Sequence, residues 1–421
     1  LIIGLQKRGA VVGSSLNTAY LLERLSQTLE RLETLMAIFV SNRYLPRRIL
    51  LLTGCFARAA AERHSISRLW KQSSGLMARS VTQNAGDHGE HYITRDKKEY
   101  WAMFYSAAGG GVLIALMALF KTYLGSIIDD KVWKGIAEGL NYGLGFMVIF
   151  MLHFTVATKQ PAMTAARFAE AVEKTPQGKT VNMKLAQLLV DVFRSQSIAV
   201  LGNVLIAMGL AALIAFGYQY KTGEPLMNAD QIAYQLHSID PFAGTLWFAA
   251  IAGVWLFCSG IISGYFDNRS NYLNMRMRLT QHPLLKKLMS EKTRVKFANY
   301  MHENYGSLIG NLCFGMLLGI TGVVGYLTHL PLDIRHVAFS SANVGYIAVS
   351  GHFTYSLLLQ CIGFVLLIGL VNLIVSFSLT LWVALRSLNA EIDSWWPIWH
   401  EVCQIVKKRP LSLFLPVQLD K

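Results

Sequence analysis

The sequence has little charge for its length. Only 15% of its 421 residues are Asp, Glu, Lys or Arg, whereas 53% are hydrophobic and the mean hydropathy is +0.37. In an ordinary soluble domain about a quarter of the residues are charged. Apolar runs of about 20 residues, the length that crosses a bilayer, recur through the last three quarters of the chain. The composition therefore excludes a typical soluble protein and indicates an all-α polytopic membrane protein.

Several motifs of known chemistry are also missing. No GxxxxGK[ST] sequence occurs, so coupling to ATP would need another protein. Residues 1–20 lack the basic region and apolar core of a signal peptide, and because the chain begins with Leu1 we expect a preceding segment. No two cysteines form a CxxC pair, which excludes a disulfide framework and a zinc site and leaves no cofactor predicted; the five are Cys55, Cys258, Cys313, Cys361 and Cys403.

Residues 1–104 are more polar and predict a helical domain on the cytoplasmic side. Within it, residues 22–39 carry an apolar seam with alternating spacings of three and four, as in a coiled coil or a packed helical hairpin. This seam predicts self-association, a cytoplasmic protein partner, or packing within a bundle. Basic residues between 43 and 79 favour contact with anionic lipid headgroups over nucleic acid. The seam consists of Leu22, Leu25, Leu29, Leu32, Met36 and Phe39.

The apolar runs predict six transmembrane helices. Lys and Arg number 15 before the first run, then 2, 6, 1, 8 and 1 in successive connections, and 5 after the last. Because basic residues stay on the cytoplasmic side, both termini and the longer connections at 158–196 and 267–306 are predicted to lie inside. The membrane domain is then 105–388 and the cytoplasmic tail is 389–421. The predicted spans are Ala107–Ile128, Gly135–Ala157, Ser197–Tyr218, Thr245–Phe266, Ser307–His329 and Ser356–Leu385.

The spans also align in part with one another. YSAAGGGVLIALMALF at 105, SIAVLGNVLIAMGLAA at 197 and YGSLIGNLCFGMLLGI at 305 place Gly110, Gly202 and Gly310 in register. Each begins a two-span hairpin, so the alignment predicts three hairpins as parallel repeats. Small residues at one depth have a second reading, which is close packing of helices.

Polar residues inside the predicted spans are candidates for a binding site, because hydrocarbon offers them no partner. Near the outer end of the first hairpin, Lys121 and Glu138 are either two separate interfacial side chains or an ion pair. Asn203 and Asn311 would line a shared cavity or bond across helices. The candidates are Lys121, Glu138, His153, Asn203, Asn311 and Asn372.

Two stretches outside the spans add further candidates. Residues 330–349 are too short to span with their charged residues yet too apolar for a free loop, which predicts a re-entrant or interfacial piece. With residues 233–242 this piece would cap a cavity on the outer side, through His237, Asp240, Asp333, Arg335 and His336. Before the first span, His88, Glu90 and His91 predict either a weak metal site or a capped elbow.

Six stretches resemble the bacterial family named transmembrane site-specific recombinase. The resemblance runs along essentially the whole chain and implies an inner-membrane protein of Gram-negative bacteria, with no catalytic residues to carry over. The stretches are GEHYITRDKKEYWAMFYSAAGGG, ATKQPAMTAA, RSQSIAVLGN, GYFDNRSNY, LPLDIRHVAFSS and GLVNLIVSFSLTLWVAL.

The residues themselves argue against DNA cleavage. A tyrosine recombinase needs a tyrosine nucleophile and an HxxR element to stabilise the phosphate, and no HxxR occurs, since His64 and Arg68, like His91 and Arg95, stand four apart. We therefore expect a membrane-embedded binding or transport protein for a lipid or small amphiphile. A membrane-anchored scaffold and a DNA-associated recombination protein are the alternatives.

Overall fold

The computed structural model describes most of the chain from residue 93 onward and part of the region before it. The described residues are 21–36 without 23, 27, 30 and 34; 45–62; 93–157 without 95; 165; 171–172; 179–349; 353–388; 392; and 394–415. Within these ranges the structure contains helices and no strands, which confirms the all-α fold class.

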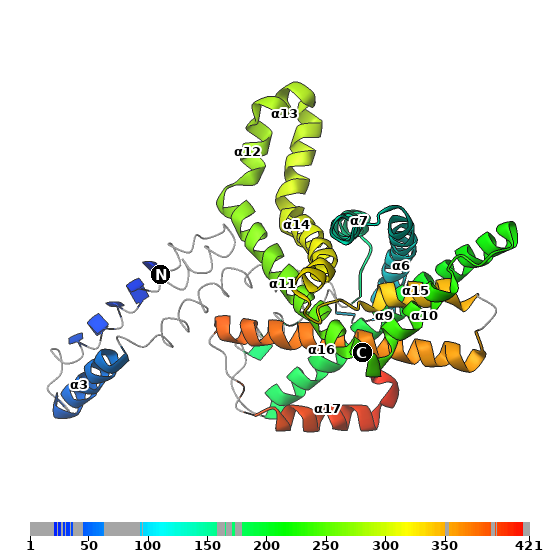
Figure 1. The fold of residues 1–421 in the computed structure, drawn as a ribbon. Coiled ribbons are helices and arrows are strands. Elements are labelled where there is room, and N and C mark those ends of the chain that lie inside the picture. Colours follow the sequence, from blue (N-terminus) through cyan, green and yellow to red (C-terminus); the bar gives the residue numbers. More distant parts are fainter. Residues whose placement is uncertain are drawn as a thin grey trace.

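Long helices dominate the fold (Figure 1). They are joined by short helices and turns at both ends. The elements are α3 (Leu45–Glu62), α6 (Lys97–Ile127), α7 (Lys131–Met151), α9 (Lys179–Thr222), α10 (Ala229–Ile239), η2 (Pro241–Ala243), α11 (Thr245–Tyr272), α12 (Met275–Gln281), α13 (Pro283–Leu288), α14 (Glu291–Thr328), α15 (Val337–Ala348), α16 (Tyr355–Leu388), α17 (Trp396–Lys408) and η3 (Pro410–Leu413).

Among the described residues, five helices are long and apolar enough to cross a membrane: α6, α9, α11, α14 and α16. They contain five of the six predicted spans. The remaining span, Gly135–Ala157, forms α7 up to Met151. It falls outside this group because Lys134, Glu138 and Asn141 lower the hydropathy of its first half.

The predicted connections are more helical than the sequence suggested. Helix α9 begins at Lys179, and α14 begins at Glu291, so both extend well before the apolar runs that they contain. Helices α12 and α13 join the ends of α11 and α14, forming a hairpin that stands away from the other helices in Figure 1. Asp96 begins α6, since its Oδ1 accepts a hydrogen bond from the Glu99 amide at 2.7 Å.

Exposed aromatic side chains gather near both ends of the long helices. Trp and Tyr favour the two membrane–water interfaces, where the ring is half buried and its polar group is hydrated. This distribution agrees with helices that cross a bilayer. At one end lie Tyr123, Trp133, Tyr218, Tyr220, Trp247, Tyr326 and Tyr355, and at the other Trp101, Tyr105, Tyr265, Tyr272 and Trp382.

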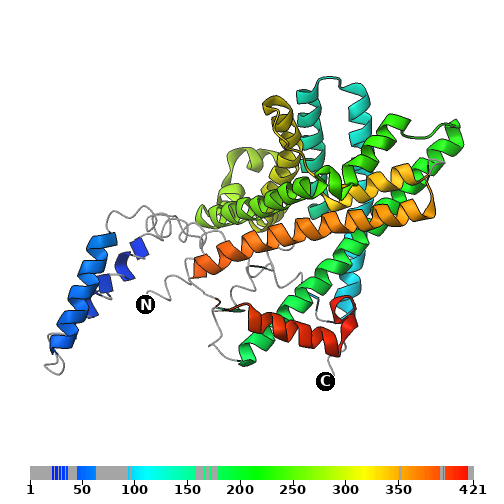
Figure 2. The ribbon, with the colours of Figure 1, turned by 60° about the horizontal axis from the view of Figure 1, so that its bottom comes forward.

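Glycines allow the closest helix contacts. Where α7 crosses α14, a Cβ on Gly315 would lie 2.0 Å from the Gly143 nitrogen, and a Cβ on Gly319 would lie 2.4 Å from the Gly139 Cα. Backbones can approach this closely only where side chains are absent. Figure 2 shows α15 running beside α16 and α9, in the middle of the bundle. Ten of its twelve residues are buried, as expected for a piece too short to span.

Candidate ligand pocket

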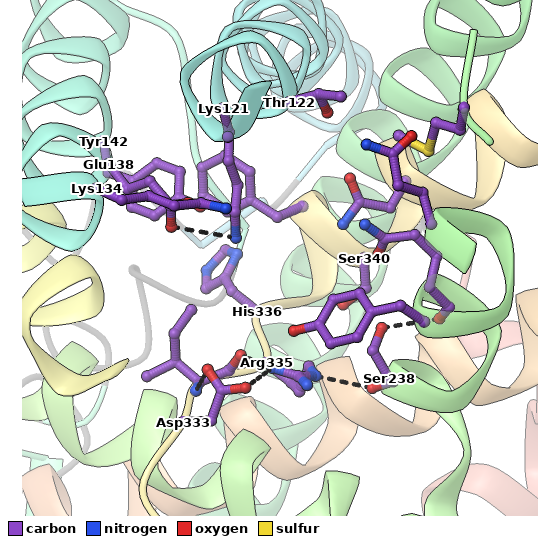
Figure 3. Close-up of a pocket in the computed structure, with 18 of the residues that line it drawn as sticks. Lys121, Thr122, Lys134, Glu138, Tyr142, Ser238, Asp333, Arg335, His336 and Ser340 are labelled. Carbon is purple, nitrogen blue, oxygen red and sulfur yellow. Dashed lines mark hydrogen bonds and ion pairs between the residues drawn. The ribbon is translucent and has the colours of Figure 1, made fainter. Parts of the chain in front are cut away.

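A pocket of about 450 Å³ opens where three connections between the long helices meet. Its walls come from the end of α6, the start of α7, helix α10, the segment Asp333–His336 and helix α15 (Figure 3). By the distribution of basic residues, these connections all lie on the predicted outer side. A volume of this size falls within the range of small-molecule sites.

One wall of the pocket is an ion pair between α6 and α7. The Lys121 ammonium lies 3.5 Å from Glu138 Oε2 and 5.7 Å from the centroid of the Tyr142 ring. Helices α6 and α7 are joined by only three residues, so side chains one or two turns from the joint face each other across the hairpin. Of the two arrangements that the sequence left open for Lys121 and Glu138, the structure contains the ion pair.

The opposite wall is built around Arg335. Its Nη1 donates to Asp333 Oδ2 at 2.6 Å, and its Nε donates to the carbonyl oxygen of Ser238, the last turn of α10, at 2.8 Å. The guanidinium also lies over the Phe248 ring, 5.4 Å from its centroid. Arg335 therefore ties the segment before α15 to α10 and α11 while its charge faces the pocket (Figure 3).

His336 lies between these walls, below Lys121 in Figure 3. Its ring is 1% exposed and is surrounded by Phe146, Phe314 and Phe339, with centroids 5.8 to 6.3 Å away. Burial in this aromatic cage lowers the pKa of His336 to about 4, because the cage offers the imidazolium no water. His336 is therefore neutral near pH 7 and adds no charge to the pocket.

Helix α10 supplies a polar wall. Its start is fixed by a capping box in which the Asn228 side chain accepts from the Gln231 amide and Gln231 Oε1 accepts from the Asn228 amide. Gln231, Tyr234 and Gln235 line the pocket from this helix, and Asn343 lines it from α15. Sequence analysis included Tyr234, Gln235 and Asn343 only as part of the predicted capping stretches and did not single them out. It missed Gln231 and Tyr142, because a polar residue in a connection or a lone tyrosine in a span gives no signal of a pocket.

Asn203, a predicted cavity residue, is fully buried but faces backbone groups. Its Nδ2 donates to the carbonyl oxygens of Ala107 in α6 and Thr155, and its Oδ1 accepts from the Ala157 amide at 2.7 Å. It therefore fixes α9 against α6 and the segment after α7, and it does not line the pocket.

Asn372 has the same kind of environment in α16. Its Nδ2 donates to the carbonyl oxygens of Ala249 at 2.7 Å and Arg335 at 3.0 Å, and its Oδ1 accepts from the Val337 amide at 3.2 Å. Asn311 donates to the carbonyl of Ser307 within its own helix. Both asparagines also lie outside the pocket, so the prediction of a cavity lined by Asn203 and Asn311 gains no support.

The other sequence candidates are dispersed. Asp240 caps η2 by accepting from the Phe242 amide at 3.0 Å, and His237 is on α10 outside the pocket. His153 follows α7 with φ 58°, and its carbonyl accepts from the Ser106 hydroxyl. The weak metal candidates His88, Glu90 and His91 lie outside the described residues. No group of metal-ligating side chains occurs in the part of the chain that the structure describes.

The charges that line the pocket balance. Lys121, Lys134 and Arg335 stand against Glu138, Asp230 and Asp333. Separated charges of both signs, together with amides and a tyrosine, suit a small molecule that is dipolar or zwitterionic at one end. The aromatic cage around His336 adds an apolar surface beside them.

The model of a protein family described as site-specific recombinase matches residues 2–416. No curated protein and no solved structure matches the chain.

Proposed function

Although the chain belongs to the site-specific recombinase family, whose name implies DNA recombination, we propose that it is a membrane-embedded binding or transport protein for a lipid or small amphiphile. The proposal places the protein in the bacterial inner membrane with six spans and both termini cytoplasmic. Its main support is the pocket of about 450 Å³ with the Lys121–Glu138 pair on one wall and Arg335 on the other.

The position of the pocket favours an amphiphile. The pocket lies beside the ends of membrane-length helices, near the exposed aromatic residues Tyr123, Tyr234 and Trp133. With the pocket open to the outer side, a headgroup bound between the charged walls would lie at interfacial depth, while its chain would reach the apolar surface of the helices. An anionic or cationic group alone would meet both attraction and repulsion here, so a zwitterionic headgroup fits best.

Native mass spectrometry of the protein purified in mild detergent tests the proposal. We expect a retained small amphiphile, which the Lys121→Met, Glu138→Gln double variant should lose without a change in net charge. Lys131→Met is the matched control, because Lys131 lies on α7 over the Tyr326 ring, outside the pocket. An empty wild-type protein, or a ligand that the double variant keeps, would contradict the proposal.

A scaffold role is the second candidate, and one observation favours it. Along the helical residues near the start, the seam side chains Leu25, Leu29, Leu32 and Met36 are 44 to 55% exposed. An apolar stripe at this spacing is typical of a helix that packs on another. A photocrosslinker at Leu29 should then yield an adduct with a second copy or a cytoplasmic protein, and the absence of any adduct would count against this role.

The proposal also predicts the result for DNA. Purified protein should leave supercoiled DNA intact under conditions in which a control recombinase nicks or recombines it. Cleavage that is lost on replacement of a single residue of this chain would restore the recombinase reading. Since no HxxR element is available to stabilise a phosphate transition state, we expect none.

A further inference from the structure

Two buried asparagines bind backbone groups in the same three-bond pattern. Asn203 and Asn372 each donate once to a long helix and once to the segment that follows α7 or α14. Each then accepts from the amide two residues further along that segment. The corresponding residues are Ala107 and Ala249, Thr155 and Arg335, Ala157 and Val337, and Asn203 and Asn372.

The helices that receive these bonds share a local sequence. Both α6 and α11 contain Ala-Ala-x-x-Gly-Val, beginning at Ala107 and at Ala249. The glycines of this motif also have the same neighbours. A Cβ on Gly111 would meet the Asn203 carbonyl at 2.9 Å, and one on Gly253 would meet the Asn372 carbonyl at 3.1 Å. The correspondence therefore extends from single bonds to a helix pair, α6 with α9 and α11 with α16.

The crossing of α7 and α14 relates the same two halves. Gly139 lies against Gly319, and Gly143 lies against Gly315. When the numbering of α7 is shifted onto that of α14, Gly139 corresponds to Gly315 and Gly143 corresponds to Gly319. The Gly139–Gly319 contact then becomes the Gly315–Gly143 contact, and the reverse also holds. The same shift places His153 on His329, and both histidines have positive φ after their helix, 58° and 56°. Contacts that exchange in this way define a two-fold axis perpendicular to the two helices.

These correspondences divide the membrane part into two units: α6, α7 and α9, then α11, α14 and α16. If the long helices cross a bilayer, a two-fold axis perpendicular to them lies in the membrane plane, and the units have inverted topology. The register of Gly110, Gly202 and Gly310 predicted three parallel hairpins. The contacts agree better with two units of inverted topology. Helix α7 becomes the counterpart of α14, which is apolar enough to span.

The pocket lies where the two units meet. Lys121 and Glu138 come from the first unit, Arg335 and Asn343 come from the second, and α10 belongs to the connection between the units. A site between inverted units can be exposed to either side by rocking of one unit on the other. The α7–α14 glycine crossing is the natural pivot, because it brings the backbones together without interlocking side chains.

We infer that the chain is built from two inverted three-helix units and moves its ligand across the membrane by exposing the pocket between them alternately to each side. This inference rests on the proposed function, in which the pocket binds a small amphiphile. It adds that the protein is a transporter and assigns the halves that move.

Cysteine accessibility in right-side-out and inside-out membrane vesicles tests the inference. A membrane-impermeant maleimide is the probe, and labelling is quantified on the peptide that carries the new cysteine. Asn343→Cys in the pocket should be modified from both sides, at rates within about tenfold of each other. Leu152→Cys and Thr328→Cys, the exposed ends of α7 and α14, are controls and should each react from one side only, on opposite sides.

Each outcome decides a separate point. Reaction of Leu152→Cys and Thr328→Cys from the same side would overturn the inverted repeat. Reaction of Asn343→Cys from a single side would overturn alternating exposure, even if native mass spectrometry finds a bound amphiphile. A two-sided pocket in a protein that retains no amphiphile would instead contradict the proposed function and leave the repeat standing. Thr122→Cys, on the α6 wall of the pocket, replaces Asn343→Cys if that variant does not fold.

Discussion

Single residues in the pocket differ sharply in how their polarity is satisfied. Arg335 has a carboxylate, two backbone carbonyls and an aromatic face as partners, so its charge is compensated although the side chain is only 14% exposed. The next residue, His336, is caged by phenylalanines and stays neutral. These adjacent positions thus differ in role, because Arg335 places a charge at the ligand site and His336 forms part of its uncharged wall.

The buried His336 predicts acid sensitivity of the fold. Above pH 6.5 both folded and unfolded chains hold a neutral imidazole, so the residue contributes nothing to the pH dependence. Between pH 6.5 and about 4 only the unfolded chain takes up the proton, which lowers the free energy of unfolding by up to about 3 kcal/mol. Melting temperatures in detergent should fall over this window, and His336→Gln should flatten the dependence. An unchanged slope in that variant would disprove this account.

The two buried asparagines, Asn203 and Asn372, predict matched losses of stability. Asn203→Ala and Asn372→Ala each remove three hydrogen bonds to buried backbone groups, two carbonyls and one amide. Unmade buried hydrogen bonds cost about 1–3 kcal/mol each, so both variants should lose several kcal/mol. Asn304→Ala, which removes a bond to the Tyr300 carbonyl within α14, is the control and should lose less. Thermal unfolding in detergent measures all three variants. A large effect of only one of the Asn203 and Asn372 substitutions would argue against the equivalence of these two asparagines.

At the scale of elements, the positions of the helices could be predicted and their pairing could not. The bilayer fixes the length and hydropathy of a span, so five of the predicted spans coincide with apolar helices. For Lys121 and Glu138 the sequence left an ion pair and two separate side chains open, and the short joint between α6 and α7 brings them together. In contrast, Asn343 became a pocket residue only because α15 lies among helices distant in sequence. Hydropathy carries no signal of that contact, and the three-hairpin repeat that glycine register suggested stays a prediction.

Helix α14 offers a direct test of the α7–α14 crossing, because two of its glycines have opposite environments. A Cβ on Gly319 would lie 2.4 Å from the Gly139 backbone, whereas nothing lies within 4 Å of one on Gly322. Gly319→Ala should therefore force the helices apart and lower the melting temperature clearly. Gly322→Ala should be neutral or raise it slightly, since alanine favours the helix by about 1 kcal/mol. Equal effects of the two substitutions would show that the helices do not meet as described.

For the whole molecule, the open question is whether α7 crosses the membrane despite its charges. Its 21 residues extend about 31 Å at 1.5 Å per residue, which matches a hydrocarbon core of about 30 Å. Its polar half lines the pocket and pairs with α6, so Lys134 and Glu138 face away from lipid. In the proposed topology α7 is therefore the sixth span, because the connections that follow α6 and α14 can lie on the same side only if α7 returns the chain across the membrane.

Labelling of two exposed turns decides the topology. Asp129→Cys lies in the joint between α6 and α7, and Leu288→Cys lies at the end of α13, where the side chain is 78% exposed. With basic residues retained inside, an impermeant maleimide should reach Asp129→Cys in intact spheroplasts and Leu288→Cys only after permeabilisation. If α7 does not cross, each later helix crosses in the opposite direction, and the turn that holds Leu288 lies outside. Both cysteines would then react in intact spheroplasts, and the inverted repeat would fail with the six-span arrangement.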